Sequence, residues 1–593
     1  MTLDDALLEV DRIFERFADR GVVPGFAWGV IVDGELVRAN GGGTRCAGED
    51  ARPDADTVFR IASMTKSFTA STLLLLRDEG RLSLDDPVAR WVPDVADLRA
   101  PTRDAPSITI RHLMTMSGGL PTDDPWGDRQ QGLPLDRFAE LLRGGLSTAL
   151  PPDTRFEYSN LGYGILGRVI SAVAGVEYDD VVRARFLEPL GMTSTTYRLE
   201  AVARDRLAVG YVKRDDTWIP DPIDPYGALA PMGGVFTTVT DLARWVGGFL
   251  DAFPARDDPP GRHPLARASR REMQQIHRAE DPELRWTTAD APPDLESGGY
   301  GYGLFVWQDL RLGPIVGHGG GYPGYGSHMR WHPASGIGVV GFSNMRYGPV
   351  VLPVRDALRT LVSAEPKRSR RPRPWPETLA ARATVEGLLE TWDDAAATDL
   401  FAMNIELDEP VALRRQAIRR LAEVHGRLEP DGSEPVVSDT PAHLAWWLRG
   451  ERGRVRIEIL MTPERPPRVQ KLAIVSIPEP PARLATVAER VVALLEHPAP
   501  AWPADVPLGA EVDREALDRT LRAAEAVWGP VRLGPAIGGD GRTVARWRLP
   551  GPRGTLELEL ELAVAEAASD DGEPPISKVV LVPSTLFMPI PET

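Results

Sequence analysis

A stretch rich in proline and arginine, AEPKRSRRPRPWPE at residues 364–377, divides this chain of 593 residues. Prolines are poorly tolerated inside helices and central strands, and a dense run of basic side chains favours contact with water. The basic residues are Lys367, Arg368, Arg370, Arg371 and Arg373. We therefore predict a solvated linker at 364–377, with a basic docking patch as the alternative, and separate folded units on either side.

Beyond the linker the chain repeats itself at an offset of about 100 residues. The run LRRQAIRRLAEVHGRLEP at 413–430 is echoed by LDRTLRAAEAVWGPVRLGP at 517–535. The paired positions are Gly426 with Gly529, Trp447 with Trp547, and Lys471 with Lys578. Each copy begins with a helical pattern and continues with strands of alternating polarity such as RVRIEIL and TLELELEL. This predicts two duplicated α+β modules, 378–480 and 481–593, without a chemical motif in either.

Composition excludes several classes of function. A net charge of −17 argues against nucleic-acid binding, which requires positively charged surface. No run approaches the ~18 apolar residues of a membrane span, and the N-terminus reads as an amphipathic helix rather than a signal peptide. The single cysteine, Cys46, excludes an internal disulfide, and neither His328 nor His332 has metal-ligand spacing. We expect a cytoplasmic protein with no cofactor, no metal, and no membrane or nucleic-acid partner.

Lysine is rare in this chain, and one lysine has a suggestive position. Of the 68 basic residues only five are lysines, and one of them closes Ser63-Met64-Thr65-Lys66 at the start of a helical pattern. Residues three apart lie on one helix face, so Ser63 and Lys66 can meet. A lysine amine with a lowered pKa can take the proton of a serine, whereas arginine stays protonated. A chance match, with Ser63 as a helix cap and Lys66 on the surface, is the alternative.

Two further motifs follow in order along residues 1–363. Tyr158-Ser159-Asn160 precedes an apolar helix, and His318-Gly319-Gly320-Gly321 lies on a strand. The ordered set resembles the serine β-lactamase and penicillin-binding-protein superfamily. The Tyr-Ser-Asn form is similar to the class C β-lactamase-related branch, with its esterases, D-aminopeptidases and penicillin-binding-protein-type thioesterases. The resemblance extends over about residues 5–362.

The resemblance implies an α+β fold, in which a mainly antiparallel sheet is flanked by helices and carries a helical insertion. It implies that Ser63 forms an acyl-enzyme, that Lys66 and Tyr158 share its proton, and that Asn160 holds Lys66 and the substrate. The backbone N–H groups of Ser63 and Gly321 would form the oxyanion hole. Expected substrate-binding residues are Gly319 and Gly320, which leave room beside the strand, and Trp126, Tyr322 and Tyr325, for which simple packing is the alternative.

One departure from the family pattern concerns the substrate. Lysine and threonine usually stand where this chain has His318-Gly319, and a histidine is a weaker, pH-dependent partner for an anion. Efficient β-lactam hydrolysis is therefore not expected. A structural hydrogen bond in the cleft wall is the other interpretation of His318.

These observations favour a serine hydrolase that cleaves an amide, peptide or ester bond through an acyl-Ser63 intermediate. Peptide acyl transfer or cyclisation is the alternative, and a true β-lactamase or a catalytically silent binding protein are further ones. The expected partners are a small-molecule or peptide substrate and a second copy of the chain bound through the C-terminal modules.

Overall fold

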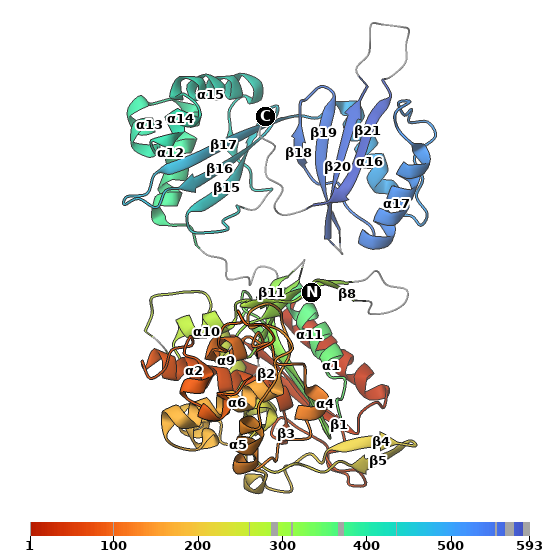
Figure 1. Ribbon diagram of the computed structural model, residues 1–593. Helices are drawn as coiled ribbons and strands as arrows, with labels where there is room; N and C mark the ends of the chain where they lie inside the picture. The colour runs from red at the N-terminus through yellow and green to blue at the C-terminus, as the bar shows by residue number, and fades with distance from the viewer. Residues whose placement is uncertain are drawn as a thin grey trace. The chain divides into compact units, whose positions relative to one another are not determined.

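The computed structural model describes residues 2–98, 100–259, 261, 263–285, 294–309, 312–365, 373–433, 436–551, 554–563 and 574–584. The chain divides into two compact units, Met1–Arg370 and Arg371–Thr593 (Figure 1). Residues 366–372 of the expected linker lie outside the described residues. The domain boundaries expected at 363, 378 and 481 stay predictions.

The first unit contains a nine-stranded sheet of antiparallel pairs. Its strand order is β2-β1-β13-β12-β11-β10-β9-β7, with β8 paired to β9. The strands are β1 (Gly25–Val32), β2 (Glu35–Gly43), β7 (Arg278–Ala279), β8 (Glu283–Arg285), β9 (Asp294–Tyr300), β10 (Phe305–Asp309), β11 (Gly313–Tyr322), β12 (Tyr325–His332) and β13 (Ile337–Ser343). The first hairpin turns at Asp33, whose φ of 52° suits this tight turn. The fold class expected from the sequence is confirmed.

Helices cover both faces of this sheet, which explains the unbroken apolar run of β1. On one face, α1 (Leu3–Asp19) and α11 (Val351–Ala364) pack against Phe26, Trp28 and Val30. On the other, α2 (Lys66–Asp78), α6 (Asn160–Ala174) and α9 (Val239–Leu250) belong to the core that includes Ala27 and Ile31. Successive residues of one strand thus anchor two helical layers.

Short elements fill the region between α2 and β7 and form the helical insertion. They are η2 (Val88–Arg90), η3 (Pro93–Val95), α3 (Ile110–Met114), α4 (Asp124–Gly127), α5 (Leu135–Arg143), α7 (Tyr178–Val182), η4 (Arg183–Leu187), η5 (Leu199–Ala201), β4 (Tyr211–Arg214), β5 (Thr217–Pro220), α8 (Ala230–Gly233), β6 (Phe236–Thr237) and α10 (Arg267–Met273). Strand β6 pairs with β3 (Phe59–Arg60), just before the 3-10 turn η1 (Ala62–Thr65).

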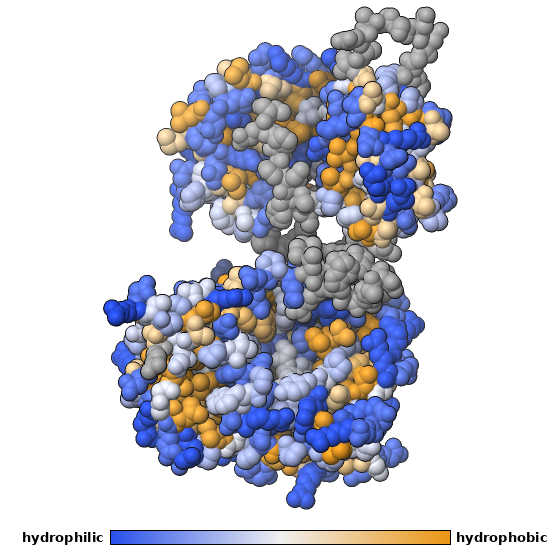
Figure 2. All heavy atoms as spheres, turned by 45° about the vertical axis from the view of Figure 1, so that its right-hand side comes forward, coloured by the Kyte–Doolittle hydropathy of each residue, from blue (hydrophilic) through white to orange (hydrophobic). Residues whose placement is uncertain are grey.

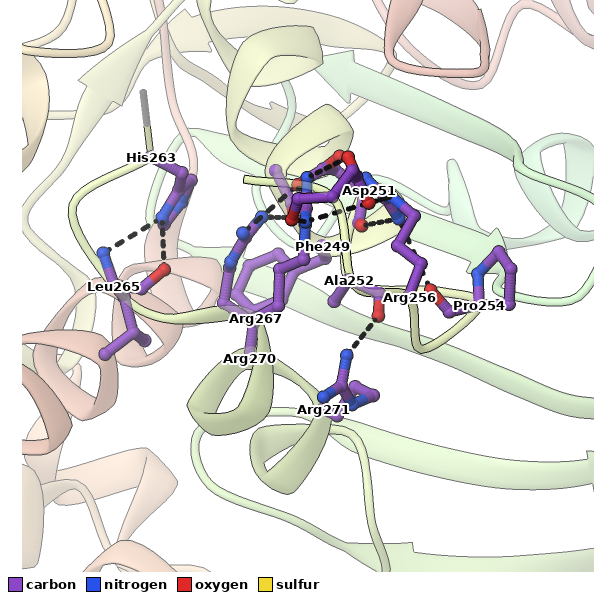
Figure 3. Close-up of polar contacts among 12 residues, drawn as sticks. Phe249, Asp251, Ala252, Pro254, Arg256, His263, Leu265, Arg267, Arg270 and Arg271 are labelled. Carbon is purple, nitrogen blue, oxygen red and sulfur yellow. Dashed lines mark hydrogen bonds and ion pairs between the residues drawn. The ribbon is translucent and has the colours of Figure 1, made fainter. Parts of the chain in front are cut away.

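Ion pairs fix the connection between α9 and α10 (Figure 3). The Asp251 carboxylate accepts from Arg267 and Arg270, each at 3.2 Å, and also from Arg256. Arg271 donates to the carbonyl of Ala252 at 2.8 Å. Several cations share one carboxylate at the end of α9, where their charge also complements the helix dipole.

The second unit holds two modules of helices followed by a four-stranded antiparallel sheet. The first comprises α12 (Pro376–Glu390), α13 (Asp394–Leu400), α14 (Asn404–Asp408), α15 (Val411–His425), β14 (Glu429–Pro430), β15 (His443–Gly450), β16 (Gly453–Met461) and β17 (Val469–Pro478). The second comprises α16 (Ala482–Leu494), α17 (Arg514–Trp528), β18 (Ala536–Gly539), β19 (Val544–Gly551), β20 (Gly554–Leu562) and β21 (Ile576–Pro583). Strand orders are β14-β15-β16-β17 and β18-β19-β20-β21.

The duplication extends to single side chains. Gly426 and Gly529 follow helices of 15 residues each, and both have φ near +70°, at 74° and 69°. Lys471 pairs with Glu458 at 2.9 Å, and Lys578 pairs with Glu559 at 2.8 Å. The two modules are thus copies at the level of individual contacts.

One expected repeat pair is wrong by one residue. Trp446, not Trp447, is the counterpart of Trp547, because Trp446 lies opposite Ile457 and Trp547 lies opposite Leu558 in the same register. Trp446 and Trp547 both belong to the apolar cores of their modules. Side chains alternate across a strand, so the adjacent Trp447 points to the opposite face.

Hydrophilic side chains cover most of the face shown in Figure 2, with small apolar areas between them. No helix among the described residues is long and apolar enough to cross a lipid bilayer. The same residues contain no group of three or more His, Cys, Asp or Glu side chains that could hold a metal ion.

Candidate active site

Ser63 lies in η1, directly before α2, and the backbone there is tightly packed. The preceding Ala62 has φ 48°, an unusual value for a residue other than glycine. A Cβ on Gly320 of β11 would lie 2.2 Å from the carbonyl oxygen of Ile61. Ser327 of β12 donates to that same carbonyl at 2.8 Å. The segment that carries Ser63 is therefore fixed against the strand that carries the glycine run.

Lys66 is fully buried, so the interpretation of Lys66 as a surface charge is wrong. Its Nζ lies 2.9 Å from Ser63 Oγ, 2.7 Å from Asn160 Oδ1 and 2.9 Å from the carbonyl of Met232. Burial lowers the pKa of Lys66 to about 8, against the opposing effect of nearby aspartates. An amine with this pKa has a neutral fraction near pH 7 that can accept the proton of Ser63.

Tyr158 and Asn160, at the start of α6, lie beside Lys66. Ser159 caps this helix, since its hydroxyl accepts from Gly162 N at 3.1 Å. The Tyr158 side chain interacts with Ser63, and Lys66 Nζ lies 4.8 Å from the centre of the tyrosine ring. Burial raises the pKa of Tyr158 well above its ordinary value, so the phenol keeps its proton at neutral pH. The structure thus brings Ser63, Lys66, Tyr158 and Asn160 together.

Two carboxylates that sequence reasoning missed orient Asn160. Asp124 Oδ1 accepts from Asn160 Nδ2 at 2.7 Å, and Asp123 accepts from the backbone N of Asn160 at 2.6 Å. With its NH₂ group bound to a carboxylate, the Asn160 amide must present its oxygen to Lys66. The signal that could have found them is the run Asp-Asp-Pro-Trp-Gly-Asp at 123–128, three acids in six residues.

His318 lies beside this cluster but is uncharged. It is 2% exposed, its Nε2 lies 3.0 Å from the Tyr300 hydroxyl, and its Nδ1 lies 2.6 Å from the carbonyl of Gly319. Burial, and then the charge of Lys66, lower the pKa of His318 to about 3. The expectation that His318 changes charge near neutral pH is therefore wrong.

The glycines after His318 face protein atoms. A Cβ on Gly319 would lie 3.2 Å from His328 Nδ1, and one on Gly321 would lie 2.4 Å from Tyr347 Cδ1. The contact of Gly320 with Ile61 adds to this packing, and the expected substrate binding beside Gly319 and Gly320 stays a prediction. Close packing alone already requires glycine at 320 and 321.

Of the three aromatic residues expected in the cleft, two are packed in the interior. Tyr322 and Tyr325 are fully buried. Tyr322 donates to Asp224 at 2.7 Å, and Tyr325 donates to the carbonyl of Ala208 at 2.8 Å. Neither side chain forms a substrate-binding surface. Trp126 is 38% exposed and lines a pocket of about 560 Å³ together with Asp123 and Ser159. This pocket adjoins the turn that carries Tyr158 and Asn160.

Known proteins resemble this chain in both sequence and fold. The family model described as Beta-lactamase matches residues 10–364. Penicillin-binding protein 4 of Amycolatopsis lactamdurans is 31% identical over 55% of this chain and 81% of its own length. The D-alanyl-D-alanine-carboxypeptidase/endopeptidase AmpH of Escherichia coli K12 is 30% identical over 55% of this chain and 82% of its own. The octameric penicillin-binding protein homologue from Pyrococcus abyssi shares the fold, with a TM-score of 0.52, 20% identity and 98% coverage of both chains.

Proposed function

Because this chain belongs to the beta-lactamase family and is a serine hydrolase, we propose that Ser63 is its nucleophile and Lys66 the base that activates it. The observation that carries the proposal is the 2.9 Å separation of Ser63 Oγ and Lys66 Nζ, with the amine buried. Burial makes the neutral amine accessible near physiological pH, as a general base requires.

The proposed reaction has two steps. Lys66 takes the Ser63 proton while Oγ attacks the substrate carbonyl, and the backbone N–H groups of Ser63 and Gly321 bind the oxyanion that forms. Collapse of this intermediate breaks the bond to the leaving group, which receives a proton from Lys66 through the Tyr158 hydroxyl. Water then attacks the acyl-enzyme by the same route and releases the acid. Asn160 is proposed to hold Lys66 in place and to bind the substrate.

We infer a preference for esters, amides or peptides without a carboxylate beside the scissile bond. The AmpH relative is named both carboxypeptidase and endopeptidase, and the endopeptidase part of the name supports a peptide substrate without a terminal carboxylate beside the scissile bond. A neutral, buried His318 supplies no positive charge for a substrate carboxylate at its position, and Asp124 and Asp128 add negative charge near Lys66. Nitrocefin turnover comparable to that of small esters would contradict this inference.

The nucleophile is tested by labelling with a fluorophosphonate probe. We expect the wild type to be labelled and Ser63→Ala to be unlabelled. Lys66→Arg should also lose labelling because the guanidinium cannot accept a proton. Lys213→Arg is the matched control, since Lys213 forms a surface ion pair with Asp216 at 3.0 Å and should label normally. Labelling of Lys66→Arg at the wild-type rate would refute the assignment of the base.

We also propose self-association through the C-terminal modules. Its support is the octameric relative of similar fold and the high exposure of two apolar side chains, Met403 at 83% and Leu407 at 78%. Light scattering should show an oligomer in the wild type and a smaller species in the double variant Met403→Glu/Leu407→Glu. A monomeric wild type would refute the proposal.

The proposed location is the cytoplasm. A single cysteine leaves no internal disulfide that would require an oxidising compartment. Cell fractionation tests the location, and recovery in a secreted or periplasmic fraction would contradict it.

A further inference from the structure

A tyrosine distant in sequence from the catalytic motifs bridges two parts of the first unit. The Tyr347 hydroxyl donates to Asp128 Oδ2 at 2.6 Å. Tyr347 follows β13 on the sheet side, whereas Asp128 directly follows α4 in the helical insertion. Tyr347 is 50% exposed and Asp128 only 4%, so the bridge is open to solvent at its tyrosine end.

The Tyr347 end of the bridge contacts the proposed oxyanion donor, and the Asp128 end is linked to the residue that orients Asn160. On the sheet side, the Tyr347 ring lies against Gly321, where an added Cβ would be only 2.4 Å from Tyr347 Cδ1. On the helical side, Asp128 N donates to the carbonyl of Asp124 at 3.1 Å, and the Asp124 side chain holds Asn160 at 2.7 Å. The ring is thus placed beside the proposed oxyanion donor and tied to the loop that orients Asn160.

The backbone at Tyr347 is held in a conformation that tyrosine rarely adopts. Its φ is 50°, in the left-handed region. Tyr347 N donates to the carbonyl of Tyr325 at 3.1 Å, and Gly348 N donates to that of Met345 at 2.9 Å. The neighbouring Arg346 pairs with Asp221 through two hydrogen bonds of 2.7 and 2.6 Å. Unfavourable backbone angles persist only where the surroundings fix them, and they concentrate at functional sites.

We propose that Tyr347, anchored by Asp128, is a specificity-determining residue that limits the size of the acyl group a substrate can place beside Gly321. The proposal rests on acylation of Ser63 as proposed above. A small acyl group fits beside the ring, whereas a rigid bulky one must displace the ring and break its hydrogen bond to a carboxylate, which is among the stronger kinds of hydrogen bond.

The test compares kcat/KM for p-nitrophenyl benzoate and p-nitrophenyl acetate, which share a leaving group and differ in acyl size. We expect Tyr347→Ala to raise the benzoate-to-acetate ratio about tenfold, the scale on which pockets discriminate groups of this size. Tyr347→Phe keeps the ring and loses only the anchor, so its ratio should rise by less. Asp128→Asn keeps an acceptor oxygen for the Tyr347 hydroxyl, so its benzoate-to-acetate ratio should stay near that of the wild type. Trp218→Ala on β5, which removes an aromatic side chain elsewhere, should leave the ratio unchanged.

The outcomes separate this proposal from the proposed function. If the enzyme hydrolyses p-nitrophenyl acetate but the benzoate-to-acetate ratio is the same in Tyr347→Ala and in the wild type, the role proposed for Tyr347 is wrong and the proposed function stands. A rise of the ratio in Trp218→Ala equal to that in Tyr347→Ala would also overturn the role of Tyr347. No hydrolysis of either ester and no fluorophosphonate labelling in the wild type would refute the proposed function, and the role of Tyr347 with it.

Discussion

The protonation of Lys66 should control the pH dependence of acylation, and the charge of Asp124 should affect the pH at which the rate changes. Burial brings the pKa of Lys66 to about 8 from 10.5. At pH 7 roughly 10% of the amine is then neutral, compared with about 0.03% for an ordinary lysine. The shift therefore enlarges the reactive fraction by about 300-fold, equivalent to about 3 kcal/mol.

Replacement of Asp124 by asparagine perturbs this balance in a defined direction. Among the carboxylates that oppose the effect of burial, Asp124 acts most strongly on Lys66. The substituted amide could still accept from Asn160 through its own side-chain oxygen, so the geometry can survive while the charge is lost. Without this charge the ammonium form is less stable, and the pKa of Lys66 should fall by about one unit.

The assay is the pH profile of kcat/KM for p-nitrophenyl acetate, which reports pKa values of the free enzyme. We expect an inflection near pH 8 in the wild type, because the pKa of His318 is about 3 and that of Tyr158 lies well above 10, so neither titrates nearby. In Asp124→Asn the inflection should move to lower pH, while Asp136→Asn, at an exposed site on α5, should match the wild type. An inflection above pH 10, or an upward shift in Asp124→Asn, would refute the assignment of Lys66 as base.

Three further predictions concern packing and stability. Trp446→Ala should cost about 3–5 kcal/mol in unfolding free energy by denaturant titration, because Trp446 lies in the module core; an equal or larger cost for Trp447→Ala would contradict the assignment of Trp446, rather than Trp447, to that core. Gly320→Ala should lose esterase activity, because its Cβ would lie 2.2 Å from the Ile61 carbonyl, and Gly319→Ala, with 3.2 Å to its nearest neighbour, should lose less; the reverse order would count against the packing explanation. Burial raises the pKa of Asp128 to about 6 from 3.8, so its contribution to stability is fully present below pH 4 and is lost as pH rises through 6. Relative to Asp128→Asn, the wild type should therefore lose about 3 kcal/mol between pH 4 and 7, and a constant difference between their unfolding free energies would refute this.

The parts of the site that the sequence predicted depend on local geometry. Ser63 and Lys66 are three residues apart at the start of a helix, and helical spacing alone predicts their approach. Tyr158 and Asn160 were indicated by their motif and its resemblance to a known family. The antiparallel sheet was implied by the same resemblance, whereas the duplicated modules were predictable because alternating and helical patterns are strong over their length.

The parts that were missed or misjudged depend on contacts between distant segments. Asp124 precedes Asn160 by 36 residues, and no periodic pattern links the two. The charge state of His318 depends on burial among aromatic rings, with Phe305 and Tyr300 at 5.1 and 5.8 Å between ring centres. Tyr322 resembles a cleft residue in sequence, yet its ring packs 3.9 Å from the buried Arg60 guanidinium. Such environments are created only when the fold is complete.

The pairing of β1 with β13 also determines when the first unit can form during synthesis. Ala27 lies opposite Phe342, and Val32 lies opposite Ile337, so the interior strand β1 has only β2 beside it until β13 exists. A ribosome adding about 5–20 residues per second needs about 15–60 s for the roughly 300 intervening residues. Through that time an apolar strand edge is open to wrong partners. A nascent chain stalled before Ser343 should therefore engage chaperones strongly, and release should coincide with the arrival of β13.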